Sequence, residues 1–343
     1  MAYTLPPTSV VDIISRRLEY VIDQLKKGGL AKSLLPDTDK AGDVAEFLTL
    51  VRKSILHDKK RVRFFLESIA MGNLRKALDI FSSFLTSGHT DAGKILSIYR
   101  SADAYTIPLH EFIKSIGLGD NRYYHGELSF VLNLYSISDE SRPCHFTKLR
   151  ILEYLYFHRN RVSAGYGLGF VRTEVITREF ERIGTSDVDI GESLKLLAGV
   201  LLIENEVYDS QVISQAYRIT PAGRYYMRYL AGKFSYLDLV LQDTPIGDDS
   251  VFAVLDELLR TGEVESKFKR VRTFLDYLKV EEEREFYVVM STSESLALRR
   301  SMIPRMIAEF QEDEAYIRRR IVKRRKDYQG ESTPYTIEKE VLE

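Results

Sequence analysis

The sequence contains few residues whose types and spacing could perform catalysis. Residues 88–95 fit the start of a phosphate-binding loop, Gly-x-x-x-x-Gly-Lys, but Ile95 stands where a Ser or Thr must hold Mg²⁺. His110 and Glu111 could begin a His-Glu-x-x-His zinc motif, but Lys114 replaces the second histidine. Cys144 is the only cysteine, which excludes an internal disulfide and a zinc site built on several thiolates. We therefore expect no enzyme activity of this chain alone, no metal and no cofactor.

Arg75 lies in the more informative run Gly72-Asn73-Leu74-Arg75-Lys76-Ala77-Leu78. Gly72 is expected to end one helix and Asn73 to cap the next, which places Arg75 in a first helical turn. A helix N-terminus attracts anions, and an arginine there adds a bidentate phosphate donor. The apolar residues expected to be buried on this helix are Leu74, Ala77, Leu78, Phe81, Phe84 and Leu85. Arg75 lies off that stripe, so it is either a phosphate sensor or a solvated arginine of an ordinary helical hairpin.

This run resembles the sensor-2 motif in the lid of AAA+ ATPases related to origin-recognition initiators and of similar STAND-type NTPases. In that family the pattern Gly-[Asp/Asn]-x-Arg-x-Ala-Leu places the arginine on the γ-phosphate, so the resemblance implies nucleotide sensing by Arg75. Residues 5–17 resemble the entry into such a lid. The family's ATPase core should precede the lid, and none precedes it here. The resemblance therefore implies a core on a separate subunit, or a truncated or split gene product.

Helical periodicity dominates the first 140 residues. Apolar residues at spacings of three and four predict helices near 11–25, 43–55, 62–70, 74–85, 109–116 and 128–135. The first four are expected to form a lid-like bundle over residues 1–98, and residues 99–140 a helical connector.

From residue 145 the pattern predicts a winged helix over residues 141–233. Its parts are three helices near 146–156, 173–183 and 186–201, a hairpin of 202–208 with 215–219, and a closing helix that begins at Thr220-Pro221. Residues 234–328 are predicted to be helical at 251–260, 264–280, 293–310 and 312–328, with a loose tail over 329–343. The expected fold class is mainly α: a lid-like bundle, a winged helix-turn-helix with a small β-hairpin, and a helical C-terminal region.

Basic residues of this half are candidate contacts to DNA phosphates. In DNA-reading winged helices the third helix enters the major groove. Here that helix carries Asp187, Asp189 and Glu192 against Lys195 alone, which disfavours groove insertion. We therefore expect weak, salt-dependent contacts to the backbone without sequence specificity. The residues expected to make them are Arg172, Arg178, Arg182, Arg218, Arg318, Arg319, Arg320, Lys323 and Arg324. The alternative is a solvated face, with Glu309 and Glu314 pairing with the last cluster.

Composition limits the classes of function. The chain has 343 residues, with 49 Lys and Arg against 50 Asp and Glu, so no strong overall attraction to a polyanion is expected. No apolar run approaches the ~20 residues of a membrane span, and we expect a cytoplasmic protein without a membrane partner. The sequence predicts a regulatory, DNA-associated part of an AAA+/STAND-like NTPase that lacks its own core. The alternative is a protein-interaction adaptor; possible partners are DNA, a separate ATPase core or another protein.

Overall fold

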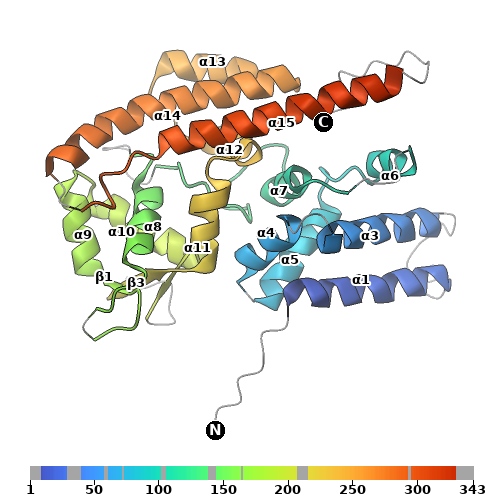
Figure 1. Cartoon of the computed structure of the whole chain (residues 1–343), viewed down its shortest axis with the longest axis horizontal. Coiled ribbons are helices and arrows are strands. Elements are labelled where there is room, and N and C mark those ends of the chain that lie inside the picture. The colour runs from blue at the N-terminus through green and yellow to red at the C-terminus, as the bar shows by residue number, and fades with distance from the viewer. Residues whose placement is uncertain are drawn as a thin grey trace, which may run out of the picture. The chain divides into compact units, whose positions relative to one another are not determined.

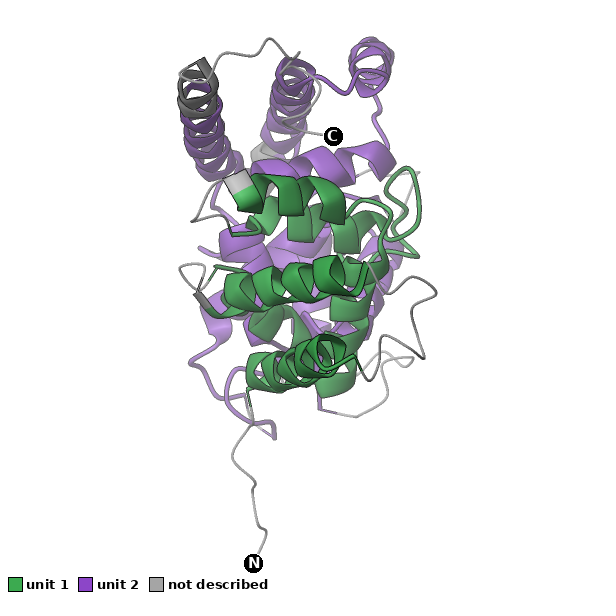
Figure 2. Cartoon of the chain, turned by 90° about the vertical axis from the view of Figure 1, so that its right-hand side faces the viewer, with its two compact units in different colours: residues 1–131 green, residues 132–343 purple. Residues whose placement is uncertain are grey.

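The computed structural model describes residues 9–28, 40–57, 61–71, 73–101, 106–137, 144–163, 165–206, 215–292 and 295–329. Within these ranges the chain is mainly helical with one small antiparallel sheet, which confirms the predicted fold class (Figure 1). The chain divides into two compact units, residues 1–131 and 132–343 (Figure 2). The division falls inside the stretch predicted to be a connector. No helix in the described ranges is long and apolar enough to cross a membrane.

The first unit is a bundle of short helices. They are α1 (Val10–Lys26), α3 (Lys40–His57), α4 (Arg61–Ala70), α5 (Leu74–Thr86), α6 (Ala92–Ser101) and α7 (Leu109–Leu118). Helix α6 was not predicted, because the glycines and polar residues before it read as a turn. The Asp91 side chain caps it by accepting a hydrogen bond from the Lys94 backbone N–H at 2.9 Å. A helix, α5, precedes residues 88–95, so this segment lacks the strand that a phosphate-binding loop follows.

The core of the first unit brings α4, α5 and α7 together around aromatic rings. Phe84 stacks on Phe112 with ring centres 4.2 Å apart, and Phe65 meets Phe112 edge-on at 6.2 Å. All three rings are almost fully buried. The buried stripe of α5 is therefore narrower than predicted, since Leu74, Leu78 and Leu85 are only half-buried. The stripe consists of Ala77, Ile80, Phe81 and Phe84.

The second unit contains a helix–sheet module, Thr147–Ile219. Its elements are α8 (Thr147–His158), β1 (Val171–Arg172), α9 (Thr173–Arg182), α10 (Asp187–Gly199), β2 (Ile203–Asn205) and β3 (Ala216–Ile219). The antiparallel sheet has the order β1-β3-β2. The predicted hairpin is present as β2 and β3, with Ile203 opposite Ile219. Strand β1 was not predicted, because a two-residue strand is too short to show alternation.

Helices that follow the module complete the second unit. They are α11 (Pro221–Tyr225), the π-helix η1 (Tyr226–Leu230), α12 (Phe234–Val240), the 3₁₀ turn η2 (Leu241–Asp243), α13 (Asp249–Leu259), α14 (Val264–Thr292) and α15 (Ile303–Gln329). Helix α15 is continuous, whereas the sequence pattern predicts two helices that meet near residue 311. The sequence around residue 311 contains no proline or glycine that would end a helix. Its start is fixed by the buried Glu282 carboxylate of α14, which accepts hydrogen bonds from the Met302 and Ile303 backbone N–H groups at 2.6 and 3.2 Å.

The helix predicted over residues 128–135 is wrong, because this segment consists of turns and irregular backbone. Its polar backbone groups bond to distant side chains instead of to one another. The Leu134 N–H donates to the Tyr236 hydroxyl at 2.9 Å, and that hydroxyl donates to the Leu132 carbonyl at 2.8 Å. The Asn133 side chain donates to the Val240 carbonyl at 3.2 Å. Tertiary hydrogen bonds thus replace the helical ones that local periodicity suggested.

Candidate functional site

Three of the predicted phosphate contacts lie on β1 and α9. Arg172 ends β1 and precedes the first residue of α9, and Arg178 and Arg182 follow at exposed positions one turn apart. Arg182 pairs with Glu179 at 2.9 Å, whereas no ion pair joins Arg178 to any residue that the structure describes. The charge of Arg178 is therefore the more available of the two to an external anion.

Arg218 lies on the outer face of the sheet. Successive side chains point to opposite faces of a sheet, so Phe170 and Arg172 point to the outer face and the buried Val171 to the inner face. Arg218 lies on the same outer face as Phe170. The Arg218 guanidinium lies 4.7 Å from the centre of the Phe170 ring, and its Nε donates to Glu204 at 2.5 Å. This arginine lies over an aromatic ring, and its charge is partly neutralised by Glu204.

Further arginines that were not predicted from the sequence lie on aromatic rings in the same module and in η1. The guanidinium carbons of Arg159 and Arg228 lie 4.0 and 4.7 Å from the centre of the Tyr156 ring. The guanidinium carbon of Arg161 lies 5.1 Å from the centre of the Phe157 ring. The signal in the sequence is the run 156–161, in which Tyr156 and Phe157 are followed at three and four residues by Arg159 and Arg161.

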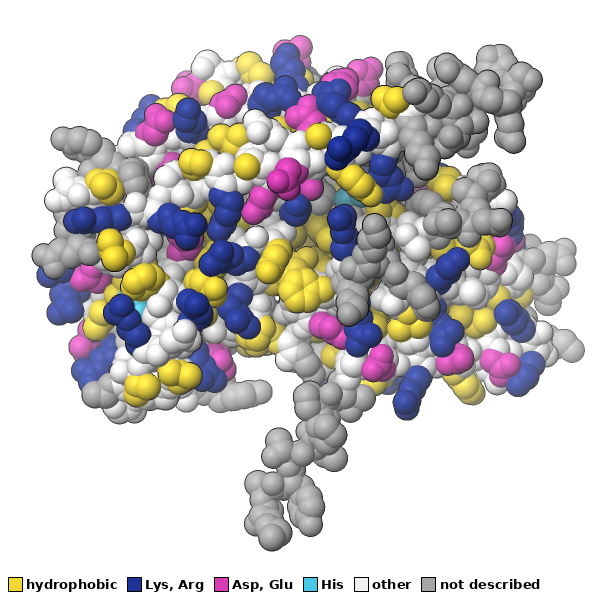
Figure 3. All heavy atoms as spheres, viewed as in Figure 1, with side chains coloured by type: hydrophobic (Ala, Val, Ile, Leu, Met, Phe, Trp, Pro, Cys, Tyr) yellow, Lys and Arg dark blue, Asp and Glu magenta, His cyan; other side chains and the backbone are white. Residues whose placement is uncertain are grey.

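We call the combined set the arginine–aromatic cluster. Its members are Tyr156, Phe157, Arg159, Arg161, Tyr166, Phe170, Arg172, Arg178, Arg218 and Arg228. Figure 3 shows Lys and Arg side chains gathered on the left of the face drawn, over the helix–sheet module. Attraction between a guanidinium and a ring face restricts the orientation of the five arginines that lie over rings, which are all those of the cluster except Arg178. The cluster therefore presents flat, cationic surfaces whose positions are largely set.

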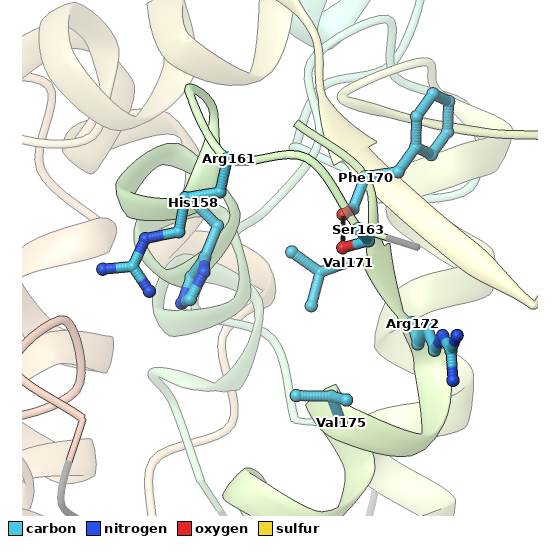
Figure 4. A pocket seen from close by; sticks show the side chains of 7 residues that line it. All are labelled: His158, Arg161, Ser163, Phe170, Val171, Arg172 and Val175. Atoms are coloured by element: carbon cyan, nitrogen blue, oxygen red, sulfur yellow. Dashed lines mark hydrogen bonds between the residues drawn. The ribbon is translucent and has the colours of Figure 1, made fainter. Parts of the chain in front are cut away.

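A shallow hollow of about 310 Å³ lies within this cluster, between the end of α8 and the start of α9. His158 and Arg161 line one side and Val171 and Val175 the other, as Figure 4 shows. Burial, together with the charge of Arg161, lowers the pKa of His158, so this imidazole is neutral at pH 7. The hollow thus combines apolar walls, an uncharged ring and a guanidinium at its edge.

A glycine holds the loop that closes this hollow. Gly169 has φ +81°, a left-handed conformation that L side chains rarely adopt. A Cβ at this position would lie 3.0 Å from the Arg159 carbonyl oxygen, and the Gly169 N–H donates to the Arg161 carbonyl at 2.8 Å. The glycine-rich stretch 165–169 is therefore a close turn against the end of α8.

Helix α10 has a different surface. Val188 and Leu196 are 60% and 41% exposed. The acidic residues Asp187 and Glu192 are also exposed, and Lys195, the basic residue of this helix, donates to Glu192 at 2.9 Å. The outward side of α10 is therefore apolar and acidic, which is unfavourable against phosphates.

Asp189 was predicted to add to this outward negative charge, and that expectation is wrong. The side chain is 1% exposed. It accepts a hydrogen bond from the Thr147 hydroxyl, which ties α10 to α8, and one from the Ser193 hydroxyl within α10. Asp189 therefore stabilises the module from within, because a buried carboxylate must be hydrogen-bonded.

The predicted basic cluster on α15 is only partly available. The guanidinium of Arg318 donates to both carboxylate oxygens of Glu265 at 2.5 and 2.7 Å and to Glu314 at 2.9 Å. Arg319 is exposed, and Arg320 lies over the Tyr316 ring at 5.7 Å. The side chains of Lys323 and Arg324 lie outside the described residues. Arg318 serves packing between α14 and α15, and its predicted pairing with Glu314 is present.

In the first unit, Arg75 is exposed in the first turn of α5. The Asn73 side chain caps this helix, as predicted, by accepting a hydrogen bond from the Lys76 backbone N–H at 3.0 Å. Gly72 lies outside the described residues. The position of Arg75 fits an anion contact at a helix N-terminus.

Removing the Arg75 side chain should leave the first unit stable. We expect Arg75→Ala to change the free energy of unfolding by less than ~0.5 kcal/mol, because the side chain is exposed. Asn73→Ala is the matched control, and loss of its cap should cost ~1 kcal/mol. Urea denaturation of both variants measures the difference. A larger loss for Arg75→Ala than for Asn73→Ala would contradict the assignment of Arg75 to a surface role.

Buried ionisable groups of the second unit connect α8 with α14. The Arg150 guanidinium is 3.7 Å from the Glu285 carboxylate and donates to the Leu298 carbonyl at 3.2 Å. Burial raises the pKa of Glu285 to about 7 and also raises the pKa of the Cys144 thiol. In the part of the chain that the structure describes, no three His, Cys, Asp or Glu side chains form a group that could hold a metal ion. These residues serve packing rather than a recognisable reaction.

Comparison with protein-family models, with curated proteins and with solved structures finds no match for this chain.

Proposed function

We propose that this chain is the lid-like and winged-helix part of an AAA+/STAND-like NTPase and that its second unit contacts nucleic-acid phosphates. The observation that supports the phosphate contact most directly is the arginine–aromatic cluster on the module. Two of its arginines, Arg161 and Arg178, form no ion pair with a described residue, so their charges are available to a phosphate. The order α8-β1-α9-α10-β2-β3 supports a winged helix, since it is the order of that motif. Arg75 would sense a nucleotide held by an ATPase core outside these residues.

The contacts proposed are to the backbone of the nucleic acid. Guanidiniums pair with phosphate oxygens bidentately, and such contacts position a protein without reading sequence. Helix α10 offers no free base-reading donor among its described side chains, because Lys195 is paired with Glu192. Weak affinity, steep salt dependence and tolerance of sequence follow from this arrangement.

Charge reversal on α9 should weaken binding more than the same change on α10. We expect Arg178→Glu to weaken binding of a labelled oligonucleotide about tenfold, because a phosphate contact becomes a repulsion. Lys195→Glu is the matched control and should change the dissociation constant less than twofold. Fluorescence anisotropy from 50 to 200 mM salt measures both. Equal losses for the two variants, or tight binding at high salt that depends on sequence, would contradict this proposal.

A protein-interaction adaptor is the second candidate, and the surface of α10 favours it. Exposed Val188, Leu196 and Leu201 could bury apolar area against a protein partner. Helix α13 adds Phe252 at 57% exposure and Val254 at 40%. No oligonucleotide binding at 50 mM salt, by a chain shown to be folded, would favour this second function over the first.

A further inference from the structure

We propose that the arginine–aromatic cluster binds unpaired nucleotides of a single strand in preference to a duplex. This inference rests on the proposed function, since it specifies which form of nucleic acid the phosphate-binding surface takes. It goes beyond that function because it assigns contacts to bases as well as to phosphates.

The first argument is that the module is poorly suited to a duplex groove. A helix that enters the major groove needs outward donors for base edges and a surface that tolerates phosphates. Helix α10 presents Val188, Leu196, Asp187 and Glu192 instead. Insertion would place carboxylates next to phosphates and would offer the base edges no unpaired basic side chain of this helix, so α10 is unfavourable in a duplex groove.

The second argument is the repeated placement of guanidiniums on rings. Five such pairs lie within residues 156–228 of the described chain: Arg159 and Arg228 on Tyr156, Arg161 on Phe157, Arg172 on Tyr166 and Arg218 on Phe170. Unpaired bases stack on aromatic rings and on guanidinium planes, and every base has a face that can do so. Duplex DNA keeps these base faces inside its own stack. Planar guanidinium groups of this kind therefore gain more binding free energy from a single strand, whose base faces are accessible, than from a duplex.

The third argument is the hollow between the end of α8 and the start of α9. Its walls of Val171 and Val175 are apolar, and His158 opposite them is neutral at pH 7 (Figure 4). An unpaired base or sugar can cover these apolar walls while Arg161 at the edge meets the adjoining phosphate. Only a nucleotide that has left a base pair can enter, since the paired base is held in the helix.

Comparison of four fluorescein-labelled probes tests the inference with the whole chain. The probes are a 12-mer of thymidine, a 12-mer of uridine, a 12-mer of abasic deoxyribose phosphates and a 12-base-pair duplex, measured by anisotropy at 50 mM salt. We expect the thymidine or uridine 12-mer to bind about fivefold or more tightly than both the duplex and the abasic strand, because each stacked base adds affinity. The ratio between the thymidine and uridine probes shows whether DNA or RNA is the source of the unpaired nucleotides.

Two ring variants locate the contact. Phe157 is 40% exposed, so Phe157→Leu should fold normally and weaken binding of the preferred 12-mer about fivefold while changing duplex binding less than twofold. Phe170→Leu serves as the second variant, and Leu196→Ala on α10 is the control expected to change neither.

Three results distinguish a failure of the single-strand inference from a failure of the proposed phosphate contact. Equal or tighter binding of the duplex or of the abasic strand would overturn the single-strand inference and leave the phosphate contact standing. Ring variants that weaken all probes equally would overturn it as well. Absence of binding by every probe at 50 mM salt would overturn the proposed function itself.

Discussion

Replacing Gly223 by alanine is expected to destabilise the second unit strongly. Gly223 lies in α11 against the sheet, and an added Cβ would lie 2.1 Å from the Leu202 carbonyl oxygen. The same atom would meet Ile219 and Leu152 side chains at 3.0 and 3.1 Å. Because the backbone at Leu202, directly before β2, must move to admit the methyl group, we expect a loss above ~3 kcal/mol, more than the usual ~1–3 kcal/mol of overpacking.

Gly199→Ala provides the matched control for this substitution. Gly199 ends α10, and a Cβ built there meets no described atom within 4 Å. Alanine in a helix is favoured over glycine, so this variant should be unchanged or more stable by up to ~1 kcal/mol. Urea denaturation followed by circular dichroism measures both variants. A Gly223→Ala protein as stable as the control would show that α11 does not pack against β2 as described.

Truncating Phe84 should destabilise the first unit by ~3–5 kcal/mol, the range for large aromatic residues in a core. Phe84 is 1% exposed and stacks on Phe112 at 4.2 Å, so its removal opens a cavity between α5 and α7. Leu78→Ala, by comparison, should cost less than half as much, because Leu78 is only half-buried.

Phe64→Ala is the control for this loss, since Phe64 in α4 undergoes the same chemical change at 47% exposure. We expect it to cost less than ~1 kcal/mol. Chemical denaturation of the two variants, followed by far-UV circular dichroism, compares them directly. Similar losses for Phe64→Ala and Phe84→Ala would mean that the aromatic contact is not a core contact.

The sequence by itself determined most of the helices and their caps. Apolar residues at spacings of three and four located α1, α3, α4, α5 and α7 to within a few residues, because a helix that buries one face must show that period. Local chemistry also located the caps at Asn73 and Thr220, whose side chains bond to backbone N–H groups three residues on. These features depend on neighbours in the sequence, so the sequence contains them.

Only the tertiary structure decided which helical positions are buried and which charges are free. Asp189 looks like a surface carboxylate until the hydroxyl of Thr147, 42 residues earlier in the chain, is placed beside it. The segment 128–135 has the apolar spacing of a helix, but the Tyr236 hydroxyl forms hydrogen bonds with its backbone N–H and carbonyl groups. Each of these two features depends on a partner far away in the sequence, so no local sequence pattern predicts it.

The candidate site likewise has features that the sequence predicts and features that only the tertiary structure shows. Arg172, Arg178 and Arg218 could be proposed from charge and position along the chain, since arginine is suited to phosphate wherever it is exposed. The pairing of Arg218 with Phe170, and of Arg228 with the Tyr156 ring, required the fold. The sequence determined that the module carries positive charge. The tertiary structure decided that Arg218 and Arg228 lie over aromatic rings, because only folding brings side chains of separate elements within 6 Å of each other.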